Sequence, residues 1–410
     1  MLSDQPNIAH ISKKDKKIFR AAHLDTYLGI AGVAAVTLPS MEWHYAITLA
    51  NPKAHQIQRE DFGLFVDASK ASFKNILSSL EQLGVKSVAI RIYLTKAYLQ
   101  SKAYRRNETL ANLLHQKGYN LMLVMAQLKE SFDNPEDLPE VCDRVVQDFA
   151  PYANSYQIGE TLNRSKWGVW GPARYRQLLD STWTAFQHYD PSAKTVGPSI
   201  IDFEWYYTLY YWHLADGRFD ILNTLLYVDR VRQPENRQNS FNTLEKIRVM
   251  KAVAPQKPLW ITEVNWPIAG TGQYKPTSED EAVTTEKYRD YMLRYLIIAL
   301  SSGYVERIYW WQLHAHGYGL IDHLNGKPYP AFRAFRHLVR LLQGALPIKI
   351  ERGEKMFVYT FEKDHRQFKL LWTKDGVRFP APPMTCYSLD DTTSEIKEVS
   401  ATPIVCEEKK

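Results

Sequence analysis

Short apolar runs alternate with amphipathic segments along most of the chain, and this alternation predicts the fold. Residues 85–94 follow an amphipathic stretch that ends at Gly84, and residues 119–127 follow another that ends at Gly118, glycine being a common stop for a helix. Strands that alternate with helices form a parallel sheet, because each helix carries the chain back across one face. The strands predicted in this way are 85–94, 119–127, 154–160, 194–200, 219–228, 258–264 and 305–313.

The first strand of the sheet is predicted at residues 27–38, an apolar run that follows a basic stretch. This run also imitates the core of a signal peptide, but it starts late and no clear small-residue cleavage site follows it. With it the chain has eight βα units. Because no glycine-rich phosphate loop follows the first strand, the pattern favours a (β/α)8 TIM barrel of the α/β class over a doubly wound sheet.

The character of the sequence changes after the last predicted helix, which ends at Gly344. The stretch that follows alternates apolar and polar residues, contains a Lys-Asp-Gly turn and has no helical period. We therefore expect a barrel over residues 20–345 and a small antiparallel, β-sandwich-like domain over residues 346–410. Residues 1–19 are the segment that we consider able to complete this small domain.

Composition narrows the class of protein. Apolar residues make up 45% and charged residues 23%, as in soluble globular proteins, and the net charge of +6 includes no long basic block beyond residues 13–17, which argues against nucleic-acid binding. The cysteines, Cys142, Cys386 and Cys406, are too few and too scattered for a metal site or a disulfide framework, so reduced thiols are expected.

The apolar runs and the cysteines together determine the cellular compartment that we expect. No apolar run approaches the about 18 residues of a membrane helix, so we expect no membrane span. Reduced thiols then suggest the cytoplasm, and the alternative is the periplasm, if residues 1–40 act as an atypical signal.

Two glutamates end predicted strands: Glu160 ends the fourth and Glu263 the seventh. Three βα units of about 34 residues separate them, so they should face each other across the mouth of the barrel. Two carboxylates in different surroundings over one cleft are the equipment for glycoside hydrolysis, one ionised and one protonated.

At these positions the sequence resembles the retaining glycoside hydrolases of clan A, and its C-terminal extension is similar to that of family 39 and related bacterial polysaccharide hydrolases. The segment "WITEVNWP" is like the family's strand-seven segment, which implies that Glu263 is the nucleophile. "YQIGETLNRSKWG" lies where the family carries its Asn-Glu-Pro turn, which implies that Glu160 is the acid/base. The resemblance further implies that Arg91 lies near the nucleophile, that Tyr227 contacts it, and that a strand-eight tryptophan, for which we favour Trp311 over Trp310, forms the floor of the sugar subsite.

Two positions depart from the family's pattern. Gly159 and Thr161 replace the usual asparagine and proline that flank the acid/base, which removes a hydrogen bond to the sugar 2-hydroxyl. Asn163 could reach that hydroxyl instead, or could only cap the following turn. Trp266 and His314 are further candidates for substrate binding; His314 and His316 have the spacing of metal ligands, but no third ligand is evident and no metal is expected.

These features predict a retaining β-glycosidase that hydrolyses an oligo- or polysaccharide by double displacement, without a cofactor, as a monomer or weak oligomer. Two alternatives remain open. One is a catalytically silent glycan-binding barrel that serves polysaccharide assembly, and the other is a transglycosylase.

Overall fold

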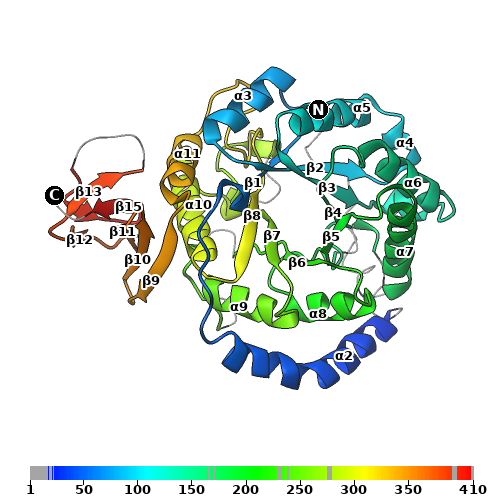
Figure 1. Ribbon diagram of the computed structural model, residues 1–410, viewed down its shortest axis with the longest axis horizontal. Coiled ribbons are helices and arrows are strands. Elements are labelled where there is room, and N and C mark those ends of the chain that lie inside the picture. Colours follow the sequence, from blue (N-terminus) through cyan, green and yellow to red (C-terminus); the bar gives the residue numbers. More distant parts are fainter. Residues whose placement is uncertain are drawn as a thin grey trace.

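The computed structural model shows a closed parallel barrel surrounded by helices, with a separate antiparallel sheet at one side (Figure 1). It describes residues 23–164, 167–169, 171–228, 232–237, 240–274, 279–389 and 395–407, together with residues 17 and 21.

Each barrel strand pairs in parallel with the next along the chain, and β1 pairs with β8 to close the ring. Seven of the predicted strands are confirmed, as is the (β/α)8 class. In the described part of the chain the eight barrel strands are β1 (Phe62–Val66), β2 (Ser87–Tyr93), β3 (Asn120–Ala126), β4 (Ser155–Ile158), β5 (Lys194–Gly197), β6 (Ile221–Thr224), β7 (Leu259–Val264) and β8 (Val305–Trp310).

The prediction for residues 27–38 is wrong. They lie within α2 (Leu24–Trp43), which a π-helical turn, His44–Thr48, continues. The first strand is instead β1, whose five residues are all buried and which directly precedes the helix that we expected after the first strand. Periodicity alone does not separate a buried strand from an apolar helix, but an apolar run of this length is typical of a helix, since buried strands usually have about 4 to 8 residues.

The helices pack their apolar faces on the outside of the barrel. Ser72 caps the N-terminus of α3 by accepting a hydrogen bond from the N–H of Asn75, and Gly84 ends that helix in the left-handed conformation, as the sequence predicted. The helices that follow α2 are α3 (Phe73–Leu83), α4 (Lys96–Leu99), α5 (Lys102–Gln116), α6 (Asp137–Phe149), α7 (Pro172–Tyr189), α8 (Trp205–Leu214), α9 (Thr243–Val253), α10 (Thr285–Leu300) and α11 (Pro330–Leu342). Short 3-10 helices are η2 (Arg59–Asp61), η3 (Lys129–Phe132), η5 (Gly272–Tyr274) and η6 (Glu279–Glu281).

The C-terminal segment forms the predicted antiparallel sheet. Five strands pair in the order β13-β15-β11-β10-β9, and two short ones form a second sheet. The strands are β9 (Leu346–Arg352), β10 (Met356–Lys363), β11 (Arg366–Thr373), β12 (Phe379–Pro380), β13 (Thr385–Ser388), β14 (Glu398–Val399) and β15 (Ile404–Glu407). Of residues 1–19, which we considered able to complete this domain, all but residue 17 lie outside the described part of the chain.

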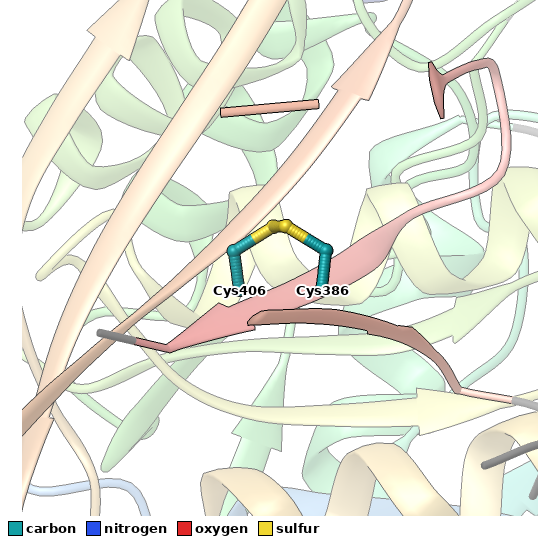
Figure 2. Close-up of a disulfide and its surroundings, with 2 residues drawn as sticks. All are labelled: Cys386 and Cys406. Atoms are coloured by element: carbon teal, nitrogen blue, oxygen red, sulfur yellow. A yellow bond between two sulfur atoms is a disulfide. The ribbon is translucent and has the colours of Figure 1, made fainter. Parts of the chain in front are cut away.

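The expectation of reduced cysteines is wrong for two of the three. Cys386 on β13 and Cys406 on β15 form a disulfide (Figure 2), and only Cys142 is free. The two positions are directly paired across neighbouring antiparallel strands. Their separation of 20 residues along the chain did not indicate this pairing, because the pairing depends on the register of β13 against β15.

A buried arginine connects the C-terminal sheet to the barrel. Arg294 of α10 is fully buried and donates hydrogen bonds to Glu235, in the connection that follows β6, and to Asp375, in the turn after β11. The indole of Trp372 on β11 donates to the same Glu235 at 2.7 Å. A buried charge must be compensated, and here its partners come from both parts of the molecule.

The described residues contain one helix that is long and apolar enough to cross a membrane, Leu24–Ile47. This helix is a candidate for a membrane span, which the sequence did not lead us to expect.

Candidate active site

Four side chains meet at the carboxyl ends of the barrel strands. Arg91 of β2 places Nη2 at 2.5 Å from Oε2 of Glu263, on β7, and at 3.2 Å from Oε2 of Glu160, just beyond β4. Tyr227, which follows β6, donates its phenol proton to Oε1 of Glu263 at 2.7 Å. The barrel thus brings together both glutamates and the two residues expected beside them. Because one nitrogen contacts both Oε2 atoms, these atoms can be no more than about 6 Å apart, close to the spacing of paired catalytic carboxyls.

Both oxygens of the Glu263 carboxyl have hydrogen-bond donors. One oxygen accepts from a guanidinium and the other from a phenol. Burial opposes the charge of Arg91, but the two glutamates outweigh burial and raise the pKa of Arg91, so that it stays a cation. Burial, and then the negative charge of Glu263, raise the pKa of Tyr227 well above its ordinary value, so that it stays a donor.

Glu160 lies in a more enclosed place, with 1% of its surface exposed. Burial raises the pKa of its carboxyl to about 7; Arg91 opposes this rise, and Glu263 adds to it. The hydroxyl of Thr161 and the amide of Gln157 donate to the carboxyl oxygens, each at 3.1 Å. The two carboxyl groups therefore have different surroundings: that of Glu160 is enclosed and has a raised pKa, and that of Glu263 accepts from a guanidinium and a phenol.

Gln127, directly after β3, positions Glu160 through the backbone. Its Nε2 donates to the carbonyl of Glu160 at 2.7 Å, and its Oε1 accepts from the N–H of Glu160 at 2.9 Å. Gln127 is fully buried, so water does not compete for these bonds. The amide thus holds the turn that presents the carboxyl.

Gly159 explains why the usual asparagine is absent. Its φ of +81° lies in the left-handed region, and a Cβ added there would come within 2.7 Å of Leu162 Cδ2 and 3.2 Å of Gln127 Oε1. Thr161 also has a positive φ, of 48°. The turn after β4 therefore follows a path that has no room for a side chain at position 159.

Aromatic rings surround the guanidinium of Arg91. Its Cζ lies 4.1 Å from the ring centre of Trp311, 5.6 Å from that of Phe65 and 5.7 Å from that of Trp167. Trp310 points the opposite way, as strand alternation requires: it is fully buried and its indole donates to Tyr288 of α10. Trp311 is thus the tryptophan of this pair that lies inside the barrel, beside the two glutamates.

The structure places the other candidates elsewhere. The side-chain amide of Asn163 donates to the carbonyl of Ile201 and to Glu204 and accepts from the N–H of Ile201, so it ties together the loops after β4 and β5. Trp266 is fully buried and stacks on Trp310, outside the barrel strands. Neither side chain forms a hydrogen bond with Glu160 or Glu263.

His314 lies in the connection after β8 and is 4% exposed. Burial, and then His323, lower its pKa to about 4, so it is neutral. His316 instead contacts Asp322, with 2.9 Å between Nδ1 and Oδ2. Among the described residues, no group of three or more His, Cys, Asp or Glu is placed to hold a metal ion.

Sequence reasoning missed Gln127, Gln157 and Trp167. The two glutamines were visible as polar residues within or just after otherwise apolar strands, at positions that face the barrel interior. Trp167 lies in an irregular loop, where no periodicity marks which side chains point inward.

Comparison with solved structures places the fold among glycoside hydrolases. A family 39 glycoside hydrolase from Bacteroides cellulosilyticus WH2 superposes with a TM-score of 0.64 at 12% identity, over 86% of this chain and 81% of that one. A family 30 endoxylanase from Clostridium papyrosolvens C71 gives 0.59 at 11%, over 87% and 98%. A family 51 alpha-L-arabinofuranosidase from Bifidobacterium longum gives 0.58 at 12%, over 88% and 97%.

The sequence itself matches no described protein family and no curated protein. At these identities the likeness establishes the fold. The (β/α)8 barrel that the resemblance implied is confirmed at this level.

Proposed function

We propose that this protein is a retaining β-glycosidase that acts on an oligo- or polysaccharide. Glu263 attacks the anomeric carbon while Glu160 protonates the glycosidic oxygen, so that the leaving group departs as an alcohol and a glycosyl ester forms on Glu263. Glu160, now ionised, then removes a proton from water, which attacks the same carbon and restores both carboxyl groups.

The observation that carries the proposal is the contact of Arg91 Nη2 with both Oε2 atoms. It keeps the two Oε2 atoms within about 6 Å of each other, which supports a retaining pair, with carboxyl groups about 5 to 5.5 Å apart, over an inverting pair at about 6.5 to 9.5 Å. The nearly complete burial of Glu160 supports its role as the acid, because a carboxyl with a pKa near 7 still holds a proton to donate at neutral pH.

Trp311 and Trp167 support a sugar as the substrate. Their rings flank Arg91 beside the carboxyl groups, and aromatic faces suit the apolar faces of pyranose rings. A transglycosylase would use the same covalent intermediate and would differ only in the acceptor, a sugar hydroxyl in place of water.

One observation favours a second function, that of a silent glycan-binding barrel. Gly159 leaves no side chain to bind the sugar 2-hydroxyl, and Asn163 is engaged elsewhere. A barrel that retained binding but lost the transition-state hydrogen bond would still hold a glycan.

Trapping of the intermediate tests the proposal. The protein is incubated with a panel of aryl 2-deoxy-2-fluoroglycosides of different sugars, whose fluorine slows hydrolysis of the glycosyl ester more than its formation. We expect one member to raise the intact mass by a single fluoroglycosyl group, with the label on the peptide that contains Glu263. The corresponding ordinary glycoside should be hydrolysed with retention, as followed by NMR.

Glu263→Gln is the matched control, because it keeps the shape of the side chain and should take up no label. Label on another residue, or hydrolysis with inversion, would contradict the retaining mechanism. Tight binding of a glycan without turnover, unchanged in Glu263→Gln, would establish the silent barrel in its place, and elongated products would indicate transglycosylation.

A further inference from the structure

Helix α2 lies outside the ring of barrel helices, alongside α8 (Figure 1). Of its twenty residues only Thr26 and Met41 are buried. Large apolar side chains stand exposed along it and the turn that follows, including Leu28 at 65%, Val36 at 81% and Trp43 at 61%. Such a surface on a water-soluble protein marks a contact with something apolar.

The apolar surface of α2 extends around the whole helix. Between residues 26 and 41 no side chain is charged, whereas α11 buries one face and carries Arg333 and Arg340 on the other. A helix that lies on a membrane surface needs a polar face, and α2 lacks one. The 24 residues of Leu24–Ile47 rise about 36 Å, enough to cross a hydrocarbon layer of about 30 Å.

Charges in the sequence orient this helix. Five basic residues precede it between positions 13 and 20, and Lys53 alone follows it before residue 59. Lys and Arg near the end of a membrane helix stay on the cytoplasmic side. Trp43 and Tyr45 lie at the opposite end, where aromatic rings favour the interface between lipid and water.

The disulfide is an independent observation on the same question. Cys386 and Cys406 are fully buried and bonded to each other within the C-terminal sheet (Figure 2). Disulfides persist in oxidising compartments and are rare in a cytoplasm. The charge pattern and the disulfide therefore agree on where the barrel resides.

We propose that Leu24–Ile47 anchors the protein in a lipid bilayer as a single transmembrane helix, with the preceding basic residues in the cytoplasm and the barrel and C-terminal sheet on the oxidising side. The anchor joins the barrel beside α9: Arg248 of that helix donates to the carbonyl of Tyr45, and Tyr304 donates to the carbonyl of Leu49. In the membrane, α2 exchanges its contact with α8 for contact with lipid.

The experiment uses the full chain, tagged at its C-terminus and produced in bacterial cells. We expect it to stay with membranes through high salt and alkaline carbonate, and to be digested when protease is added to spheroplasts. Without reductant, a maleimide reagent should label the denatured protein at Cys142 alone. Extraction by carbonate, protection from protease in intact spheroplasts, labelling of Cys386 and Cys406, or a mature chain cleaved after the helix would each overturn the proposal.

Matched variants separate lipid contact from folding. Gly32→Arg combined with Val36→Arg places two charges at exposed positions, with open space around Gly32, and should lower the membrane-bound fraction several-fold. Leu324→Arg puts a charge on an exposed residue of the barrel and should leave the membrane-bound fraction unchanged. Equal membrane retention of the double variant and wild type would also overturn the proposal.

Discussion

The side-chain amide of Gln127 is paired with both backbone polar groups of Glu160, donating to its carbonyl at 2.7 Å and accepting from its N–H at 2.9 Å. The backbone of the proposed acid/base is therefore held from the end of the neighbouring strand. The turn after β4 contains two residues with positive φ, Gly159 and Thr161, and Glu160 lies between them.

Gln127→Met removes both hydrogen bonds while nearly conserving volume. We expect kcat to fall by about 100-fold for glycosides with poor leaving groups, because the acid is displaced, and by much less for activated aryl glycosides. The free energy of unfolding should fall by about 1 to 3 kcal/mol, since buried backbone groups lose their partners. Steady-state kinetics with a series of aryl leaving groups and urea unfolding measure the two effects.

Gln177→Met is a suitable control. Its amide donates to a single carbonyl, that of Pro135, at an exposed site on α7. Neither its kinetics nor its stability should change appreciably. An equal loss of kcat for all leaving groups in Gln127→Met would assign Gln127 a structural role only.

The role of Glu160 predicts a specific chemical rescue. Glu160→Ala should form the glycosyl ester from an activated aryl glycoside and then stall, because no base activates water. Added azide needs no deprotonation, so it should restore turnover and give the β-glycosyl azide, identified by NMR. Rescue that yields the α-azide would instead show that Glu160 is the nucleophile.

Glu263→Gln should lower kcat by about 10⁴-fold with every leaving group, because the carboxylate that forms the covalent bond is absent. Glycan binding should persist, since the shape of the side chain is kept and Arg91 retains Glu160 as a partner. Calorimetric titration with an oligosaccharide that wild type cleaves measures the binding. Significant turnover in this variant would remove Glu263 from the chemistry.

Burial of Glu160 predicts the pH profile. Its pKa is raised to about 7, and the first step needs its proton, so kcat/KM should fall as the pH rises through about 7. The limb should disappear in Glu160→Ala assayed with an activated aryl glycoside, which needs no acid. A basic limb that persists unchanged in this variant would have to be assigned to another group.

Alanine variants at Gly159 and Gly217 separate the cost of a steric clash from the cost of a left-handed backbone conformation. Gly159→Ala meets both a left-handed φ and a close approach to Leu162, whereas Gly217 has a similar φ of +77° with nothing within 4 Å of an added Cβ. Gly217→Ala should cost about 1 to 2 kcal/mol, the price of the conformation. Gly159→Ala should cost clearly more in urea unfolding, and equal losses in the two variants would show that the turn after β4 relaxes freely.

The sequence was most informative where a side chain occupies a fixed place on a strand. Glu263 lies on β7 itself and Arg91 on β2, so the resemblance could be carried over by strand position, and the barrel brings the two side chains into contact. Asn163 illustrates the opposite case: it lies in a loop, and its hydrogen bonds to Ile201 and Glu204 depend on the path of a second loop, about which its own sequence carries no information.

The error at residues 27–38 has a different origin. An apolar run of that length fits a buried strand, a signal segment or a membrane helix equally well by periodicity. Counting eight strands required one more, and the run was assigned to fill that place, although β1 was available in the short run from Phe62 to Val66. The need for eight strands is thus weak evidence that any particular run of residues is a strand.

The buried hydrogen bonds around Arg294 limit how such a protein can evolve. Its cation sits on α10 of the barrel, while Asp375 and Trp372 belong to the C-terminal sheet. Exchange of that sheet for another module would leave a fully buried positive charge with only part of its compensation. Loss of a buried partner costs about 3 to 5 kcal/mol, a large fraction of the about 5 to 15 kcal/mol by which a typical domain is stable. Recombination at this junction is therefore discouraged, and the barrel and its sheet are expected to be inherited together and to melt in one cooperative transition.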